Sequence, residues 1–183
     1  ITALKWDPFG KAYMNISSAE LHRSLEIVEA VRGAVGKNVD LLIEGHGRFD
    51  IATGIKIANE LKTFAPMFFE EPTPPDNLDA LAEVHRKSPV PIAGGERIYS
   101  LNQFREFLEK GCADYAQPDV SHCGGISAIR KMAAMAETCY IALAPHNPSG
   151  PVANAATLHL AASLTGFRIL EICLTDVSWR REL

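Results

Sequence analysis

The chain has 183 residues, of which 47% are hydrophobic, and its formal net charge is −4. This length and apolar content allow a sizeable buried core, and no apolar stretch approaches the roughly 20 residues that a membrane span needs. A negative balance without a cluster of Lys or Arg gives no basic surface for nucleic acid. We therefore expect a soluble, cytoplasmic protein with a small-molecule partner and no contact with membrane or nucleic acid.

The four cysteines are at positions 112, 123, 139 and 173. None of them forms the C-x-x-C spacing of a redox or zinc motif. Most lie in or beside apolar segments, which is typical of reduced cysteines that pack in a protein interior.

In chain order, short apolar runs that favour strands alternate with segments of helical periodicity. The predicted strands end near Asp7, Glu44, Glu70, Glu96, Asp119, His146 and Glu171. The predicted helices begin near residues 18 and 101 and run near 51–64, 77–88, 125–138 and 151–164. The first of them opens on a capping-box pattern, Ser17 followed three residues later by Glu20. Strand–helix repeats of about 25 residues are βα units, so the sequence predicts one α/β domain with parallel strands.

Three glutamates occupy the same place in this repeat. Glu44, Glu70 and Glu96 each end a predicted strand and follow one another at intervals of 26 residues. A single acidic residue at a strand end is usually a turn or cap residue, but three at equal spacing point into one mouth if the sheet closes into a barrel. Carboxylate ligands without nearby sulfur suit a hard cation, and Mg²⁺ fits better than Zn²⁺.

Six motifs carry a resemblance to a known family. They are Glu44-Gly45-His46-Gly47-Arg48, Glu70-Glu71-Pro72, Gly95-Glu96-Arg97, Gln117-Pro118-Asp119, Ala144-Pro145-His146-Asn147-Pro148 and Glu171. Together they resemble the enolase superfamily, within it the mandelate racemase subgroup, and most closely its galactonate and gluconate dehydratases. The resemblance implies a TIM-like (β/α)7β barrel and a Mg²⁺-dependent enzyme. Such an enzyme removes the proton next to a carboxylate and expels the neighbouring hydroxyl, which yields a 2-keto-3-deoxy acid.

The resemblance also bears on particular residues and on the extent of the domain. It implies that Glu70 is a metal ligand supported by Glu71, whereas many relatives have aspartate where this chain has Glu44. It further implies that residues 1–183 are an incomplete barrel domain, which carries the metal and catalytic site but lacks the first strand and an N-terminal α+β capping domain. We expect residues 1–183 alone to be insoluble or molten and inactive, and the longer protein to be a homo-oligomer.

The predicted proton-transfer groups are two histidines. His146 ends one predicted strand and Asp119 ends the preceding one, close enough to accept the second ring N–H and raise the basicity of the imidazole. We predict His146 as general base and Asp119 as its orienting partner. His46, two residues after Glu44, is predicted to lie on the same strand face and to act as general acid for the leaving hydroxyl.

The remaining predicted site residues bind or polarise the substrate. Lys5 is expected to add a second cation, and Glu171, if protonated, to donate a hydrogen bond to a carboxylate oxygen. The predicted substrate contacts are Asp7, Arg48, Arg97 and Asn147. In relatives with a Lys-x-Lys pair the second lysine takes the proton, and that position is Asp7 here, which favours elimination over two-base racemisation. A racemase, epimerase or cycloisomerase of a 2-hydroxy acid remains the alternative, and a non-catalytic barrel is the third class.

Overall fold

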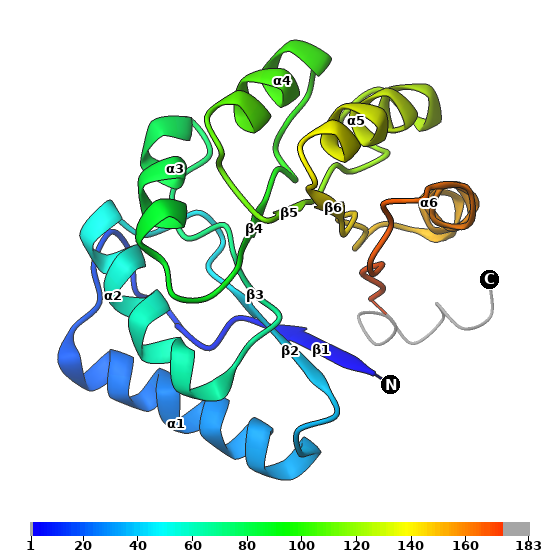
Figure 1. Ribbon diagram of the computed structural model, residues 1–183. Coiled ribbons are helices and arrows are strands. Elements are labelled where there is room, and N and C mark those ends of the chain that lie inside the picture. Colours follow the sequence, from blue (N-terminus) through cyan, green and yellow to red (C-terminus); the bar gives the residue numbers. More distant parts are fainter. Residues whose placement is uncertain (1, 174–183) are drawn as a thin grey trace. The chain divides into compact units, whose positions relative to one another are not determined.

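The computed structural model describes residues 2–173, and in this part of the chain strands alternate with helices (Figure 1). The strands are β1 (Ala3–Trp6), β2 (Asp40–Glu44), β3 (Phe68–Glu70), β4 (Ile92–Gly94), β5 (Tyr115–Ala116) and β6 (Ala142–Leu143). The helices are α1 (Ser18–Val35), α2 (Ile51–Leu61), α3 (Leu78–Lys87), α4 (Leu101–Glu109), α5 (Ile126–Thr138) and α6 (Pro151–Ser163), with a short 3-10 turn η1 (Lys62–Phe64) after α2. The predicted alternation and helix ranges are confirmed to within a few residues.

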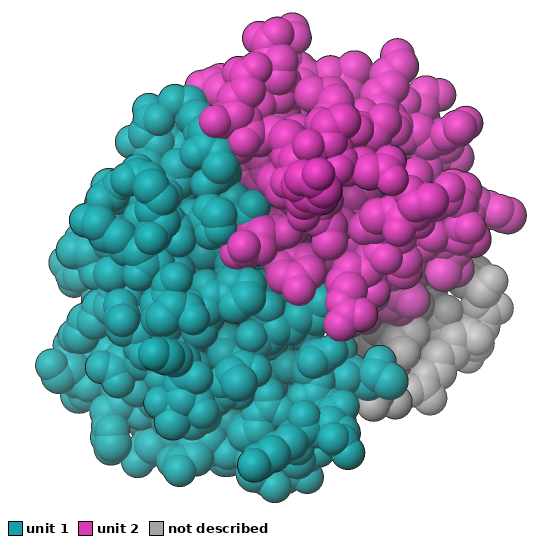
Figure 2. Space-filling view, viewed as in Figure 1, with its two compact units in different colours: residues 1–94, 110–113 teal, residues 95–109, 114–183 magenta. Residues whose placement is uncertain are grey.

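The chain divides into two compact units (Figure 2). Unit 1 consists of residues 1–94 and 110–113, and unit 2 of residues 95–109 and 114–183. The predicted site residues divide between them. Unit 1 holds Lys5, Asp7, Glu44, His46, Arg48 and Glu70, and unit 2 holds Glu96, Arg97, Asp119, His146, Asn147 and Glu171.

In unit 1, β1 to β4 form a parallel sheet in sequence order. The middle strands are almost wholly buried because their residues are apolar on both faces, as expected for parallel strands covered by helices. Helix α1 begins after a complete capping box, in which the Ser17 hydroxyl accepts from the Glu20 backbone N–H and the Glu20 carboxylate accepts from the Ser17 N–H. Register places Glu44 opposite Glu70.

In unit 2, β5 and β6 pair in parallel, with Ala116 opposite Leu143. Helices α4, α5 and α6 pack against one another in sequence order. Their inward faces contribute large buried side chains, which include Phe104, Phe107, Ile129, Met132 and Leu160. The sheet end of this unit therefore rests on an apolar core that fixes the loops after β5 and β6.

The prediction of a strand that ends at Glu171 is wrong. β6 is only two residues long, and its pairing with the following segment is a single parallel bridge between Leu143 and Phe167. The Leu143 N–H donates to the Gly166 carbonyl and the Arg168 N–H to the Leu143 carbonyl, at 2.9 and 2.8 Å. A ladder this short does not extend to residues 168–171.

Two further expectations concern burial. Among the described residues no helix has the length and apolarity to cross a bilayer. Cys112 and Cys123 are buried as predicted, but Cys139 is exposed at the end of α5 and Cys173 is partly exposed. The apolar neighbours of Cys139 in sequence misled the interpretation, because it follows the last turn of an amphipathic helix and does not lie on the inward face.

Candidate active site

Unit 1 presents two buried carboxylates beside one ammonium group. Glu44 and Glu70 end adjacent strands in register, and their relative exposures are only 4% and 0%. Lys5 on β1 reaches both, with Nζ 3.3 Å from Glu44 Oε2 and 2.8 Å from Glu70 Oε1. Lys5 is therefore held by the carboxylates that were predicted to bind metal.

The electrostatics of this pair favour an added cation. Burial raises the pKa of Glu44 to about 9, aided by the negative charge of Glu70 and opposed by Lys5 and by the His46 backbone N–H. A carboxyl group with so high a pKa has too little positive charge around it to ionise at neutral pH. A hard divalent cation would supply that charge, so the donor chemistry of Glu44 and Glu70 fits such an ion.

The backbone segments that carry Glu44 and Glu70 lie against each other. The Gly45 N–H donates to the Glu70 carbonyl at 2.9 Å, and a Cβ on Gly45 would lie 2.8 Å from the Glu71 carbonyl oxygen. Only glycine permits this approach of the two strand ends. Glu71 itself has a φ of +36°, a rarely populated conformation for a residue with a side chain, and strain of this kind is common at functional sites.

His46 lies in a turn and not on the strand face from which it was predicted. β2 ends at Glu44, and His46 has a φ of +54°, so the period of two no longer applies. Its backbone N–H donates to Glu44 Oε1 at 2.7 Å, and its Nδ1 lies 2.8 Å from Asp7 Oδ2. The ring remains half-exposed.

Asp7 and Arg48, both predicted to contact substrate, bind each other. Arg48 Nη2 donates to Asp7 Oδ2 at 2.7 Å, and the guanidinium also donates to the Gly45 and Gly10 carbonyls. Asp7 therefore accepts from Arg48 and faces His46, which makes it an orienting group for that imidazole. This arrangement is analogous to the pairing predicted for Asp119, and the sequence interpretation did not anticipate it.

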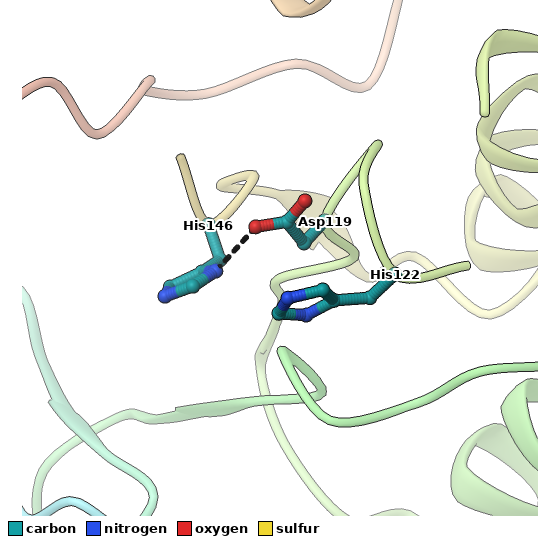
Figure 3. Close-up of side chains that lie close together, drawn as sticks. All are labelled: Asp119, His122 and His146. Carbon is teal, nitrogen blue, oxygen red and sulfur yellow. Dashed lines mark hydrogen bonds and ion pairs between the residues drawn. The ribbon is translucent and has the colours of Figure 1, made fainter. Parts of the chain in front are cut away.

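Unit 2 contains the predicted histidine–aspartate pair (Figure 3). His146 Nδ1 lies 2.7 Å from Asp119 Oδ2, and Asp119 is 1% exposed. Burial alone would raise the pKa of Asp119, but hydrogen bonds from His146 and the Ser121 N–H and the charges of His122 and His146 lower the pKa below its usual value. An ionised Asp119 accepts the Nδ1 hydrogen, which leaves the lone pair of His146 on Nε2.

Glu96 and Arg97 lie next to this pair. Glu96 Oε2 is 3.4 Å from His146 Nε2, and Glu96 Oε1 is 3.2 Å from Arg97 Nε. Glu96 is buried, at 8% exposure. His146 Nε2, the nitrogen that was predicted to take the proton, therefore faces a carboxylate that was predicted to bind metal.

His122 also belongs to this cluster, and the sequence interpretation left it as an unassigned loop residue. Figure 3 shows its ring beneath the Asp119–His146 pair, and the three side chains offer donor atoms within 4.8 Å of one another. Its Nδ1 lies 2.9 Å from the Glu96 carbonyl. The signal in the sequence was its position three residues after Asp119, in the loop that follows the same strand.

Asn147 and Glu171 meet in the same unit. The Asn147 N–H donates to Glu171 Oε2 at 3.2 Å, and its side-chain amide donates to the Glu171 carbonyl at 3.0 Å and to Asn154 Oδ1 at 2.7 Å. Asn147 is 1% exposed. The buried amide thus holds Glu171 and α6 in place and does not lie open to a substrate as predicted.

Comparison with known proteins identifies the family to which the chain belongs. The family "Enolase C-terminal domain-like" matches residues 1–183, and the chain belongs to this family. A mandelate racemase/muconate lactonizing enzyme-like protein from Rubrobacter xylanophilus DSM 9941 superposes with a TM-score of 0.94 at 40% identity, over 99% of this chain and 48% of that chain. The predicted α/β fold and the resemblance to the enolase superfamily are confirmed.

Two curated relatives carry the names of dehydratases. The D-gluconate dehydratase of Thermoproteus tenax is 37% identical over 182 residues, which are 99% of this chain and 37% of that protein. The D-gluconate/D-galactonate dehydratase of Picrophilus torridus is 38% identical over 183 residues, 100% of this chain and 47% of that protein. The chain spans less than half the length of these relatives.

Proposed function

We propose that this chain is part of a Mg²⁺-dependent sugar-acid dehydratase. The observation that carries the proposal is the hydrogen bond between His146 Nδ1 and the buried Asp119 carboxylate, which would leave the lone pair of a neutral imidazole on Nε2. The names of relatives that are 37–38% identical support a D-gluconate or D-galactonate type of substrate. A sugar acid has an acidic proton next to its carboxylate and a hydroxyl on the following carbon, which is the arrangement that elimination needs.

The proposed reaction begins with proton transfer. His146 Nε2 takes the α-proton, and the electron pair left on carbon delocalises into the carboxylate as an enediolate. Asp119 orients the ring and stabilises the imidazolium that forms. The electron pair then forms the carbon–carbon double bond as the β-hydroxyl leaves, and the enol product tautomerises to a 2-keto-3-deoxy acid.

The leaving hydroxyl needs a proton to depart as water. We assign this proton to His46, whose Nδ1 is held by Asp7, so that a protonated ring donates from Nε2. The position of the second lysine of the Lys-x-Lys pair is occupied by Asp7 in this chain, which supports elimination over a two-base racemisation.

Glu44, Glu70 and Glu96 are the proposed ligands of the cation. The proposal rests on their equivalent sequence positions, on membership of the family, and on the electrostatics of the Glu44–Glu70 pair. When bound, Mg²⁺ would supply positive charge to the substrate carboxylate as it becomes an enediolate.

The experiment is a screen of sugar acids with the complete gene product and Mg²⁺, with detection of 2-keto-3-deoxy products. We expect turnover of at least one aldonate, loss of activity in chelator and recovery with Mg²⁺. Racemised or epimerised product without dehydration would favour the alternative class, and full activity in excess chelator would exclude the proposed metal role.

A variant at position 46 separates the two proton transfers. His46→Asn is expected to retain exchange of the α-proton with deuterated solvent but to lose most product formation, because the enediolate forms while the hydroxyl leaves unassisted. If exchange and elimination fall by the same factor, His46 does not act as the acid.

A further inference from the structure

Four contacts in unit 2 form a closed cycle around the proposed base. His146 Nδ1 bonds to Asp119 Oδ2 at 2.7 Å, and His146 Nε2 faces Glu96 Oε2 at 3.4 Å. The cycle closes through His122, whose Nδ1 lies 2.9 Å from the Glu96 carbonyl and whose backbone N–H donates to the Asp119 carbonyl at 3.1 Å. His122 thus connects the backbones of the two acidic residues that face the two nitrogens of His146.

The hydrogen-bond role of His122 in this cycle is fixed by chemistry. A backbone carbonyl only accepts, so His122 Nδ1 carries a hydrogen and donates it to Glu96. The ring is further placed by its neighbours, with centroids 5.8 Å from His146 and 5.9 Å from Tyr99. Figure 3 shows the ring of His122 extending under the Asp119–His146 pair.

The position of His146 depends on more than its bond to Asp119. The hydrogen bond at Nδ1 fixes the tautomer, whereas the surroundings of Nε2 also depend on how far the loop that carries Glu96 lies from the turn that carries Asp119. Proton abstraction needs Nε2 within hydrogen-bond reach of the α-proton, and misplacement by about 1 Å can cost roughly 10²-fold in rate. The spacing between the Glu96 loop and the Asp119 turn therefore bears on where Nε2 lies.

We propose that His122 is a positioning residue that sets the distance between Glu96 and the Asp119–His146 pair, through its hydrogen bond to the Glu96 carbonyl. The role in catalysis rests on the proposed function, since it acts on the proposed base. His122 does not exchange a proton with substrate. It keeps the loop that carries Glu96 in register with the turn that carries Asp119.

Two substitutions separate the hydrogen bond from the ring. His122→Asn keeps an N–H donor at the position of Nδ1 and removes the rest of the ring, whereas His122→Phe keeps a ring and removes the donor. In the complete gene product we expect His122→Phe to lower kcat by roughly 10- to 100-fold with KM changed less than about threefold. His122→Asn is expected to recover kcat to within about threefold of wild type.

A second readout needs no substrate. In protein labelled with ¹⁵N-histidine, the Nδ1 proton of His146 is expected to give a resonance that disappears in His146→Asn. We expect this resonance to broaden or shift in His122→Phe and to return in His122→Asn. A wild-type protein that dehydrates no sugar acid would refute the proposed function, while the resonance would still decide this inference.

His85 provides the matched control, because its Nδ1 lies 2.7 Å from the Gly111 carbonyl in unit 1. His85→Phe and His85→Asn are expected to change neither kcat nor the His146 resonance, apart from any general loss of stability. A kcat near that of wild type in His122→Phe, together with a lowered kcat in His122→Asn, would show that the ring matters and not the hydrogen bond. An unchanged resonance and kcat in both His122 variants would overturn it entirely.

Discussion

Glu44 and Asp119 are both carboxylates at or just beyond strand ends, with exposures of 4% and 1%, yet their pKa values move in opposite directions. Burial raises the pKa of both carboxyl groups, but the neighbouring charges act in opposite directions. Each carboxylate accepts from one backbone N–H, but Asp119 also accepts from His146, whereas Glu44 lies against a second carboxylate that Lys5 offsets only in part. The charges around Asp119 thus come from the protein itself, while the Glu44–Glu70 pair has the donor chemistry that an added cation would satisfy.

The largest expected effect tests the unit 2 side of this contrast. His146→Asn should lower both α-proton exchange and dehydration by about 10²- to 10⁴-fold, because both need the same proton transfer. Exchange is measured by NMR in deuterated solvent with the complete gene product. His159→Asn, at an exposed position in α6, serves as the control. Exchange at the wild-type rate would remove His146 from the mechanism.

The second prediction tests the need for a cation in unit 1. Glu70→Gln removes a charged ligand and should weaken Mg²⁺ binding by at least about 10- to 100-fold. Even the loss of a group that only hydrogen-bonds to a metal ligand typically lowers metal affinity by that factor. Titration calorimetry measures this directly. Asp119→Asn should impair exchange while it leaves Mg²⁺ affinity nearly unchanged. Equal losses of affinity in the two variants would show that the two carboxylates do not differ in the way described.

The third prediction is a difference in pH dependence without metal. The pKa of Glu44 in the folded chain, about 9, lies above its usual 4.5, so the folded state binds more protons between these values and stability falls as pH rises through this range. The pKa of Asp119 is lowered, so its contribution is present above its usual value of 3.8 and is lost as pH falls through the folded pKa.

Melting temperatures in chelator across this pH range would measure both effects. Glu44→Gln should flatten the decline on the alkaline side, and Asp119→Asn should flatten the decline on the acid side. Saturating Mg²⁺ should reduce the alkaline decline in the wild type. An alkaline slope that Glu44→Gln leaves untouched would assign it to another group.

The smallest effect concerns the backbone beneath the unit 1 carboxylates. Gly45→Ala places a Cβ 2.8 Å from a backbone oxygen and should destabilise the fold by about 1–3 kcal/mol. Gly33→Ala, in α1 with no atom within 4 Å of the added Cβ, should stabilise by about 0.5–1 kcal/mol. Calorimetric melting of both variants measures the contrast. A loss in both would mean that the close approach is not the cause.

Sequence reasoning located most elements because local signals determined them. Ser17 and Glu20 marked the start of α1, and the apolar runs that end at Glu44 and Glu70 became buried strands in register. The Asp119–His146 contact followed from two neighbouring strand ends. Periodicity and capping are local properties, so these features were accessible without coordinates.

The failures occurred where tertiary contacts decide. His46 left the strand face because the chain turns at Gly45 to pass close to Glu70, which no period in the sequence reveals. The sequence did not reveal that Asp7 bonds to Arg48 and His46, and its contact with substrate stays a prediction. His122 was passed over because its bond to the Glu96 carbonyl joins residues that are 26 apart in sequence.

The segment around Glu171 is held in part by hydrogen bonds from Asn147. Residues 168–171 are not part of a strand, and Glu171 accepts two hydrogen bonds from this one buried residue, which also reaches Asn154 on α6. A substitution at Asn147 would remove the side-chain hydrogen bond to the Glu171 carbonyl and leave the one from the backbone N–H. Variation among homologous enzymes could retune the position of this carboxylate by that route, and a directed-evolution library aimed at new substrates would begin at Asn147 and Asn154.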